Sequence, residues 1–101
     1  MIYVDAIAAH GWVLRGRKTP SCHMFTDELD LEPLHALAER IGLRRAWLHD
    51  APSAPHYDLT PSRRLAAVAA GAIEVDRAEA VRIWRARRAL LTPQPPPPQP
   101  R

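Results

Sequence analysis

Three consecutive residues, His56, Tyr57 and Asp58, carry the densest chemistry in the sequence. An imidazole exchanges a proton near neutral pH, and a neighbouring carboxylate can orient or charge it. We therefore predict that His56 and Asp58 act as a catalytic pair, while Tyr57 donates a hydrogen bond. His23 is predicted as a further catalytic residue, with an imidazole suited to general acid or base catalysis.

The same residue types also suit a divalent metal ion. Imidazole and carboxylate ligands are typical of zinc, manganese and iron sites, and an open coordination position lets such an ion activate water for hydrolysis. His-x-Asp has a structural alternative, in which a backbone carbonyl satisfies the imidazole and the carboxylate caps a helix. The expected cofactor is a divalent ion, zinc or manganese. Its predicted ligands are Asp5, His23, Asp27, His56 and Asp58.

A second interpretation needs no metal. Thr60 followed by Pro61 is a strong helix start, whose first-turn amides lack partners within the helix and can bind an anion. Arg63 or Arg64 adds a planar set of donors suited to phosphate oxygens. Thr60, Arg63 and Arg64 are thus predicted to bind a phosphate-containing or other small molecule. The alternative is a solvated helix start, and no glycine-rich phosphate loop accompanies it.

A third interpretation is a binding module without catalysis. The formal net charge is +3, and four arginines, Arg82, Arg85, Arg87 and Arg88, gather near the C-terminal end. Three of these are spaced about three residues apart, so one side of a helix could follow nucleic-acid phosphates. Trp84 is the sole aromatic residue within the cluster, and an ordinary solvated helix face is the alternative.

Composition and length restrict the fold. The 101 residues, 47% of them apolar, provide for one small domain, expected over 1–91, and a proline-rich tail over 92–101 that is expected to be disordered. Such a domain buries about two-thirds of the surface of its unfolded chain, so a homo-oligomer is a further expectation. The lone Cys22 excludes an intramolecular disulfide, and we interpret it as structural.

The N-terminal region lacks the basic segment and the long apolar core of a secretory signal. It also lacks an apolar run long enough for a membrane span. We therefore expect a cytoplasmic protein that does not engage a membrane.

Secondary structure alternates along the chain. Apolar and β-branched runs predict short strands at 2–4, 12–14, 22–25, 46–48 and 72–75. Capping residues, helical spacing and terminal glycines predict three helices, beginning after Asp30, Thr60 and Asp76. Pro52 and Pro55 predict an irregular loop that carries residues 56–58.

This alternation indicates a small α/β domain with about three helices and a short mixed or mostly parallel sheet. In parallel sheets ligands bind outside the carboxyl ends of the strands. Asp5 follows the first predicted strand, His49 and Asp50 follow the strand at 46–48, and residues 56–58 enter the next helix. We therefore expect these residues to share one edge of the sheet.

Several segments together resemble a bacterial and phage family called domain of unknown function 4031. They are Ile2-Tyr3-Val4-Asp5, Cys22-His23-Met24 followed by Asp27, the helix at 34–43, His56-Tyr57-Asp58-Leu59-Thr60 with a following arginine, and Gly71-Ala72-Ile73-Glu74-Val75. The resemblance covers most of residues 1–76 and implies a fold and a shared site, but no activity.

The function favoured by these patterns is a hydrolase-like or ligand-binding activity at a polar His/Asp/Tyr site. Its ligand would be a metal ion or a phosphate-containing molecule. The alternative is a non-catalytic module that binds nucleic acid or protein through the basic C-terminal helix. The sequence leaves open whether the protein is an enzyme.

Overall fold

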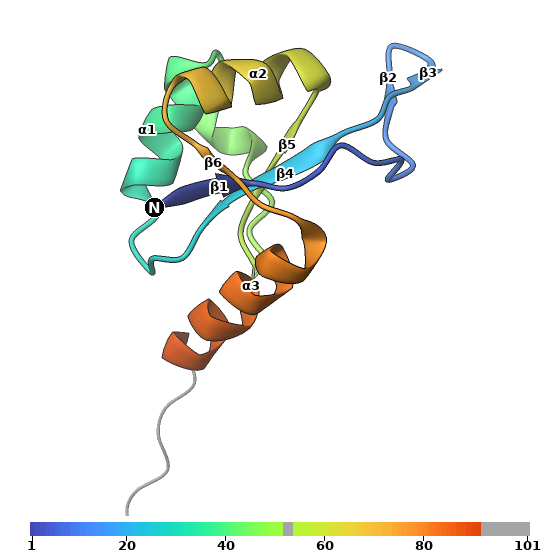
Figure 1. Ribbon diagram of the computed structural model, residues 1–101. Coiled ribbons are helices and arrows are strands. Elements are labelled where there is room, and N and C mark those ends of the chain that lie inside the picture. The colour runs from blue at the N-terminus through green and yellow to red at the C-terminus, as the bar shows by residue number, and fades with distance from the viewer. Residues whose placement is uncertain (52–53, 92–101) are drawn as a thin grey trace, which may run out of the picture.

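A four-stranded sheet with the order β5-β4-β1-β6 positions the candidate site (Figure 1). Its strands are β1 (Ile2–Val4), β4 (Cys22–Thr26), β5 (Tyr57–Leu59) and β6 (Ile73–Glu74). Strand β4 runs antiparallel to both β1 and β5, whereas β6 runs parallel to β1. The sheet is therefore mixed, which confirms the first of the two predicted alternatives, a mixed or a mostly parallel sheet. Because β4 runs opposite to its neighbours β1 and β5, its carboxyl end lies at the other edge of the sheet from theirs.

The computed structural model describes residues 1–51 and 54–91. Residues 92–101, the predicted proline-rich tail, lie outside this part of the chain. Within the described residues, no helix has the length and apolar character needed to cross a membrane.

Helices α1 (Glu32–Arg40) and α2 (Pro61–Ala69) cover one face of the sheet, and α3 (Arg77–Leu91) lies on the other (Figure 1). The predicted starts of α2 and α3 are confirmed, and α1 begins one residue later than predicted, with Leu31 and not Asp30 as its N-cap. The Asp30 carboxylate accepts a hydrogen bond from the amide of Glu32, the Thr60 hydroxyl from that of Arg63, and the Asp76 carboxylate from that of Glu79. These side chains satisfy amides that the first helical turn leaves without partners.

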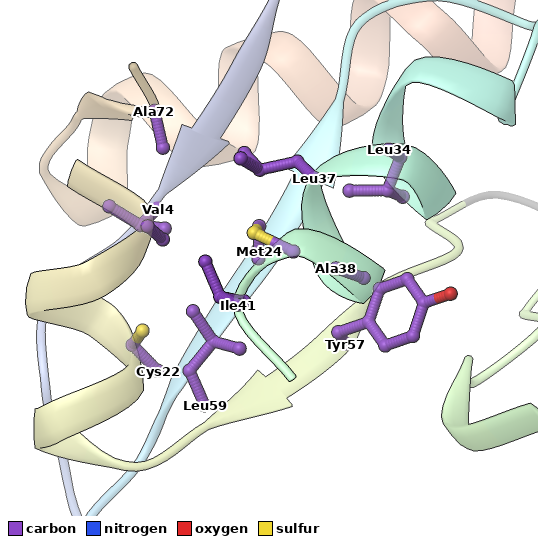
Figure 2. Packing of buried hydrophobic residues seen from close by; sticks show 11 residues of the cluster. Val4, Cys22, Met24, Leu34, Leu37, Ala38, Ile41, Tyr57, Leu59 and Ala72 are labelled. Atoms are coloured by element: carbon purple, nitrogen blue, oxygen red, sulfur yellow. The ribbon is translucent and has the colours of Figure 1, made fainter. Parts of the chain in front are cut away.

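The hydrophobic core lies between the sheet and the helices α1 and α2 (Figure 2). The sheet contributes alternate residues, which are Val4, Cys22, Met24, Tyr57 and Leu59, and the helices contribute residues including Leu34, Leu37, Ala38 and Ala67. Alternation follows from the strand geometry, in which successive side chains point to opposite faces. The residues between these core positions therefore face α3 or solvent.

Two sequence-based predictions about the middle of the chain are wrong. Residues 46–48 form no strand; instead Arg45–Trp47 is a 3₁₀ turn, η1. Arg45 holds this turn against α1 through ion pairs with Glu32 at 2.7 Å and Glu39 at 2.9 Å. Residues 56–58 do not form an irregular loop, because Tyr57–Leu59 is strand β5 and pairs with β4. Pro55, which lies two residues before the strand, restricts only the approach to it.

A hairpin projects from the sheet and was only half predicted. It consists of β2 (Val13–Leu14), inside the predicted strand at 12–14, and β3 (Arg17–Lys18), which was not predicted (Figure 1). Arg15 and Gly16 join them with φ angles of 52° and 78°. Two consecutive residues with positive φ are typical of a type I′ turn, which matches the twist of the flanking strands.

Candidate metal centre

The face of the sheet opposite the core carries a cluster of histidines around Asp58. Since Tyr57 and Leu59 are buried in the core, strand alternation directs Asp58 to the other face. On β4, His23 alternates in the same way between Cys22 and Met24. The two residues are also direct cross-strand partners, so their side chains lie side by side.

Three imidazoles approach the two oxygens of Asp58 through their Nε2 atoms. His23 Nε2 lies 3.9 Å and His56 Nε2 3.7 Å from Oδ1, and His49 Nε2 lies 2.8 Å from Oδ2. Candidate ligand atoms of His23, His56 and Asp58 all lie within 4.8 Å of one another. These three residues belong to the predicted metal-ligand set, and the structure brings them together.

Asp5 fixes the orientation of His23. Its Oδ2 lies 2.7 Å from His23 Nδ1, and its Oδ1 accepts a hydrogen bond from the His23 backbone amide at 2.6 Å. An ionised carboxylate accepts only, so Nδ1 must be the protonated nitrogen. Neutral His23 therefore presents the lone pair of Nε2 toward Asp58. The hydrogen bond to Asp5 also raises the pKa of His23, against the opposing effect of burial.

A backbone carbonyl fixes the orientation of the His56 imidazole. Its Nδ1 lies 2.8 Å from the carbonyl oxygen of Ala54, which likewise can only accept. The neutral ring again leaves Nε2 free for a ligand bond. Burial lowers the pKa of His56, so its neutral form is favoured at neutral pH.

His49 was not among the predicted catalytic, ligand-binding or metal-binding residues, although it was expected to share one edge of the sheet with residues 56–58. Its backbone forms an isolated antiparallel bridge with His56, with hydrogen bonds of 2.8 and 3.1 Å. The two rings stack with centroids 5.0 Å apart and an interplanar angle of 7°. The sequence indicated that the two histidines lie near one another, but through a strand at 46–48, whereas the structure joins them through this isolated bridge.

Two other predicted residues lie away from the cluster. Asp27 accepts a hydrogen bond from the Tyr3 hydroxyl at 3.0 Å and pairs with the amino group of Met1 at 3.1 Å. Tyr57 is buried in the core, where its hydroxyl lies 2.5 Å from His35 Nδ1. The structure therefore does not bring Asp27 or Tyr57 together with His56 and Asp58.

The predicted anion-binding residues make internal contacts. Arg64 donates to the backbone oxygen of Asp5 at 2.8 Å and pairs with Glu74 at 2.7 Å. Arg63 donates to the backbone oxygen of Ile41, and the Thr60 hydroxyl caps α2. Arg64 thus supports the segment that carries Asp5.

Helix α3 borders the cluster. The ring of Trp84 meets that of His23 edge-on at a centroid distance of 6.0 Å. Two of the helix arginines are engaged within the protein: Arg87 is buried and donates to the Glu28 backbone oxygen at 2.9 Å, and Arg82 pairs with Glu79. These contacts reduce the basic surface that α3 offers to a nucleic acid.

The buried Cys22 lies on the core side of β4. Burial and the nearby Asp5 carboxylate raise the pKa of its thiol to about 12. A thiol with such a pKa is a poor nucleophile, which agrees with the structural role expected from the sequence.

The fold and this cluster define a small mixed α/β protein with a histidine–carboxylate site on one sheet face. The chain belongs to the family described as Protein of unknown function (DUF4031), whose model matches residues 2–87. The resemblance noted from the sequence is thereby confirmed, and the match extends it into α3. No curated protein and no solved structure was found to match the chain.

Proposed function

We propose that this protein binds a divalent transition-metal ion through His23, His56 and Asp58, and that it uses the ion for hydrolysis. The observation that carries this proposal is the orientation of two imidazoles. Each has its Nδ1 engaged by a fixed acceptor and its Nε2 beside the same carboxylate. Metal-binding histidines in proteins commonly show this pattern of support.

The dimensions of the cluster suit such an ion. Zinc lies about 2.0–2.2 Å from imidazole nitrogens and carboxylate oxygens, which places tetrahedral ligands about 3.3 Å apart. The separations of 3.7 and 3.9 Å from Asp58 Oδ1 lie above that value, and all three ligand atoms lie within 4.8 Å of one another. Small side-chain movements would therefore bring all three ligands to bonding distance. Imidazole and carboxylate ligands favour zinc, with manganese as the alternative.

Three protein ligands leave a coordination position for water, as in hydrolytic zinc sites. An ion held here would supply a hydroxide near neutral pH. His49 Nε2 lies 2.8 Å from Asp58 Oδ2, the carboxylate oxygen that the other two histidines do not approach. The side chain of His49 is 60% exposed. We propose that His49 carries protons between the site and solvent, because it links the cluster to a large open cleft that it lines together with Asp58.

Elemental analysis of the purified protein and calorimetric titration with zinc test the metal site. We expect one ion per chain, and a loss of binding in His56→Ala and Asp58→Asn. Asp50→Asn is the matched control, because Asp50 is exposed and lies outside the cluster. Absence of stoichiometric zinc or manganese binding in the wild-type protein would refute the proposal, as would equal binding by Asp58→Asn.

A further inference from the structure

A cleft beside the proposed metal centre has a lining suited to nucleic acid. Its volume is about 1000 Å³, at the upper end of the range for small-molecule sites. One wall comes from the hairpin β2–β3, and the other from residues 43–49 after α1. His49 and Asp58 line it as well, so a molecule bound in the cleft extends to the edge of the histidine cluster.

Two indole rings line this cleft, those of Trp12 and Trp47. Trp47 is 52% exposed, although it is among the largest apolar side chains of the protein. The guanidinium of Arg44 lies 5.8 Å from the centre of the Trp47 ring. Exposed aromatic rings beside cations are the usual platform for unpaired bases, because every base has a face that can stack.

The charged lining is predominantly positive. Arg15, Arg17 and Arg63 line the cleft, and Asp58 is the only carboxylate among the described lining residues. Arg15 and Arg17 are exposed, and neither has an ion pair within the described part of the chain. Arg15 occupies the first turn position with φ of 52°, a backbone conformation that is unfavourable for a residue other than glycine, asparagine or aspartate. The turn thus places a guanidinium where asparagine is the usual residue.

We propose that this cleft binds single-stranded nucleic acid. Its bases stack on Trp12 and Trp47, and its phosphates contact Arg15 and Arg17 on the hairpin. A duplex would hide the base faces that the indoles require. Two rings and several cations along an open cleft exceed what one free nucleotide needs, which favours a chain of nucleotides.

The binding step stands without the metal, but its chemical consequence rests on the proposed function. A phosphodiester that reaches Asp58 would be hydrolysed. The oxygen of water would bond to phosphorus, the ester bond to one sugar oxygen would break, and that oxygen would take up a proton.

The test is fluorescence anisotropy with a labelled oligothymidylate of about 15 nucleotides, in EDTA and at low salt. We expect the double variant Arg15→Gln/Arg17→Gln to bind roughly 10-fold or more weakly, with a smaller dependence of affinity on salt. Arg82→Gln/Arg85→Gln is the matched control, because it removes the same charge from exposed positions on α3. We expect this control to bind as the wild type does.

A second pair of variants tests stacking. Trp47→Ala is expected to weaken binding by about 10-fold, whereas Trp47→Phe retains a stacking ring and most of the affinity. Thermal unfolding of each variant checks that the fold is kept, as the exposure of Trp47 and both hairpin arginines predicts.

Several outcomes would overturn the proposal. One is unchanged binding by both the hairpin variant and Trp47→Ala, and another is an equal or greater loss in the α3 control, which would place the contact on the basic helix. Equal affinity for duplex, or equally strong competition by free thymidine monophosphate, would also contradict it. Because binding is measured in EDTA, failure of the metal site appears separately in the elemental analysis.

Discussion

The carboxylate of Asp5 contacts His23 at two points. Asp5 Oδ2 lies 2.7 Å from His23 Nδ1, and Asp5 Oδ1 lies 2.6 Å from the backbone nitrogen of His23. Asp5 itself is only 8% exposed, and Arg64 binds its backbone oxygen from α2. The carboxylate of Asp5 therefore holds the imidazole of His23 in one orientation, and Arg64 in turn holds the backbone of Asp5. We interpret Asp5 as a positioning residue for His23 and not as a metal ligand.

The first prediction concerns this contact. Asp5→Asn should keep the three proposed ligands but lower zinc affinity by about 10- to 100-fold, as loss of such supporting partners commonly does. Calorimetric titration measures the change. Asp27→Asn is the control, because Asp27 was in the predicted ligand set but contacts Tyr3 instead. Equal losses in both variants would argue against the positioning role.

The second prediction is that the histidines titrate in a set order in the metal-free protein. The hydrogen bond to Asp5 raises the pKa of His23 above 6.5, whereas burial lowers that of His56 below it. NMR titration of the ring protons in EDTA should therefore show His56 losing its proton at lower pH than His23. Asp5→Asn should lower the pKa of His23 and leave that of His56 nearly unchanged. The reverse order would contradict the described contacts.

These shifts have opposite effects on stability. The protonated His23–Asp5 pair contributes stability that is fully present below the unfolded pKa of about 6.5 and is lost as pH rises through the higher folded value. His56 favours the neutral form when folded. Its contribution is therefore lost as pH falls from about 6.5 through its lowered folded pKa.

The third prediction separates Tyr57 from the metal site. Tyr57→Phe removes the partner of His35 Nδ1, and we expect it to lower the free energy of unfolding by about 1–2 kcal/mol. Urea unfolding measures this loss. Zinc affinity should stay unchanged, because the ring lies on the core side of the sheet. A large loss of zinc binding in Tyr57→Phe without a loss of stability would contradict this separation and indicate that Tyr57 contributes to the metal site.

The fourth prediction concerns the turn after α1. Gly42 has a φ of +88°, and a Cβ there would collide with the guanidinium of Arg63. Gly42→Ala should lower the free energy of unfolding by about 1–2 kcal/mol from backbone strain. An additional loss is expected because the end of the Arg63 side chain must move away, which breaks its hydrogen bond to the backbone oxygen of Ile41. Gly71→Ala is the control, because its φ is +110° but no atom lies within 4 Å of the added Cβ. Equal losses would show that Arg63 moves away freely.

Local sequence signals predicted the helices well. Thr60 and Asp76 cap α2 and α3 as expected, because a capping hydrogen bond depends only on residues a few positions apart. The prediction of a strand at 46–48 was wrong because the strand preference of a short apolar run depends on its tertiary surroundings, and here Arg45–Trp47 forms a 3₁₀ turn in contact with α1.

The candidate site was predicted from residue type more than from position. His23, His56 and Asp58 were expected to converge at the strand carboxyl ends of a mixed or mostly parallel sheet, yet they meet on one face of the antiparallel pair β4 and β5. His49 joins them through a bridge that depends on tertiary structure. The spacing of His56 and Asp58, two residues apart, was the available signal, because that spacing places both on one face of a strand.

The division of β5 between core and cluster restricts how this protein can change in evolution. Tyr57 and Leu59 pack in the hydrophobic core, while His56 and Asp58 lie on the opposite face of the sheet. Inserting or deleting one residue in β5 would exchange the two sets, burying the carboxylate and exposing the phenol. The strand should therefore not accept single-residue insertions or deletions.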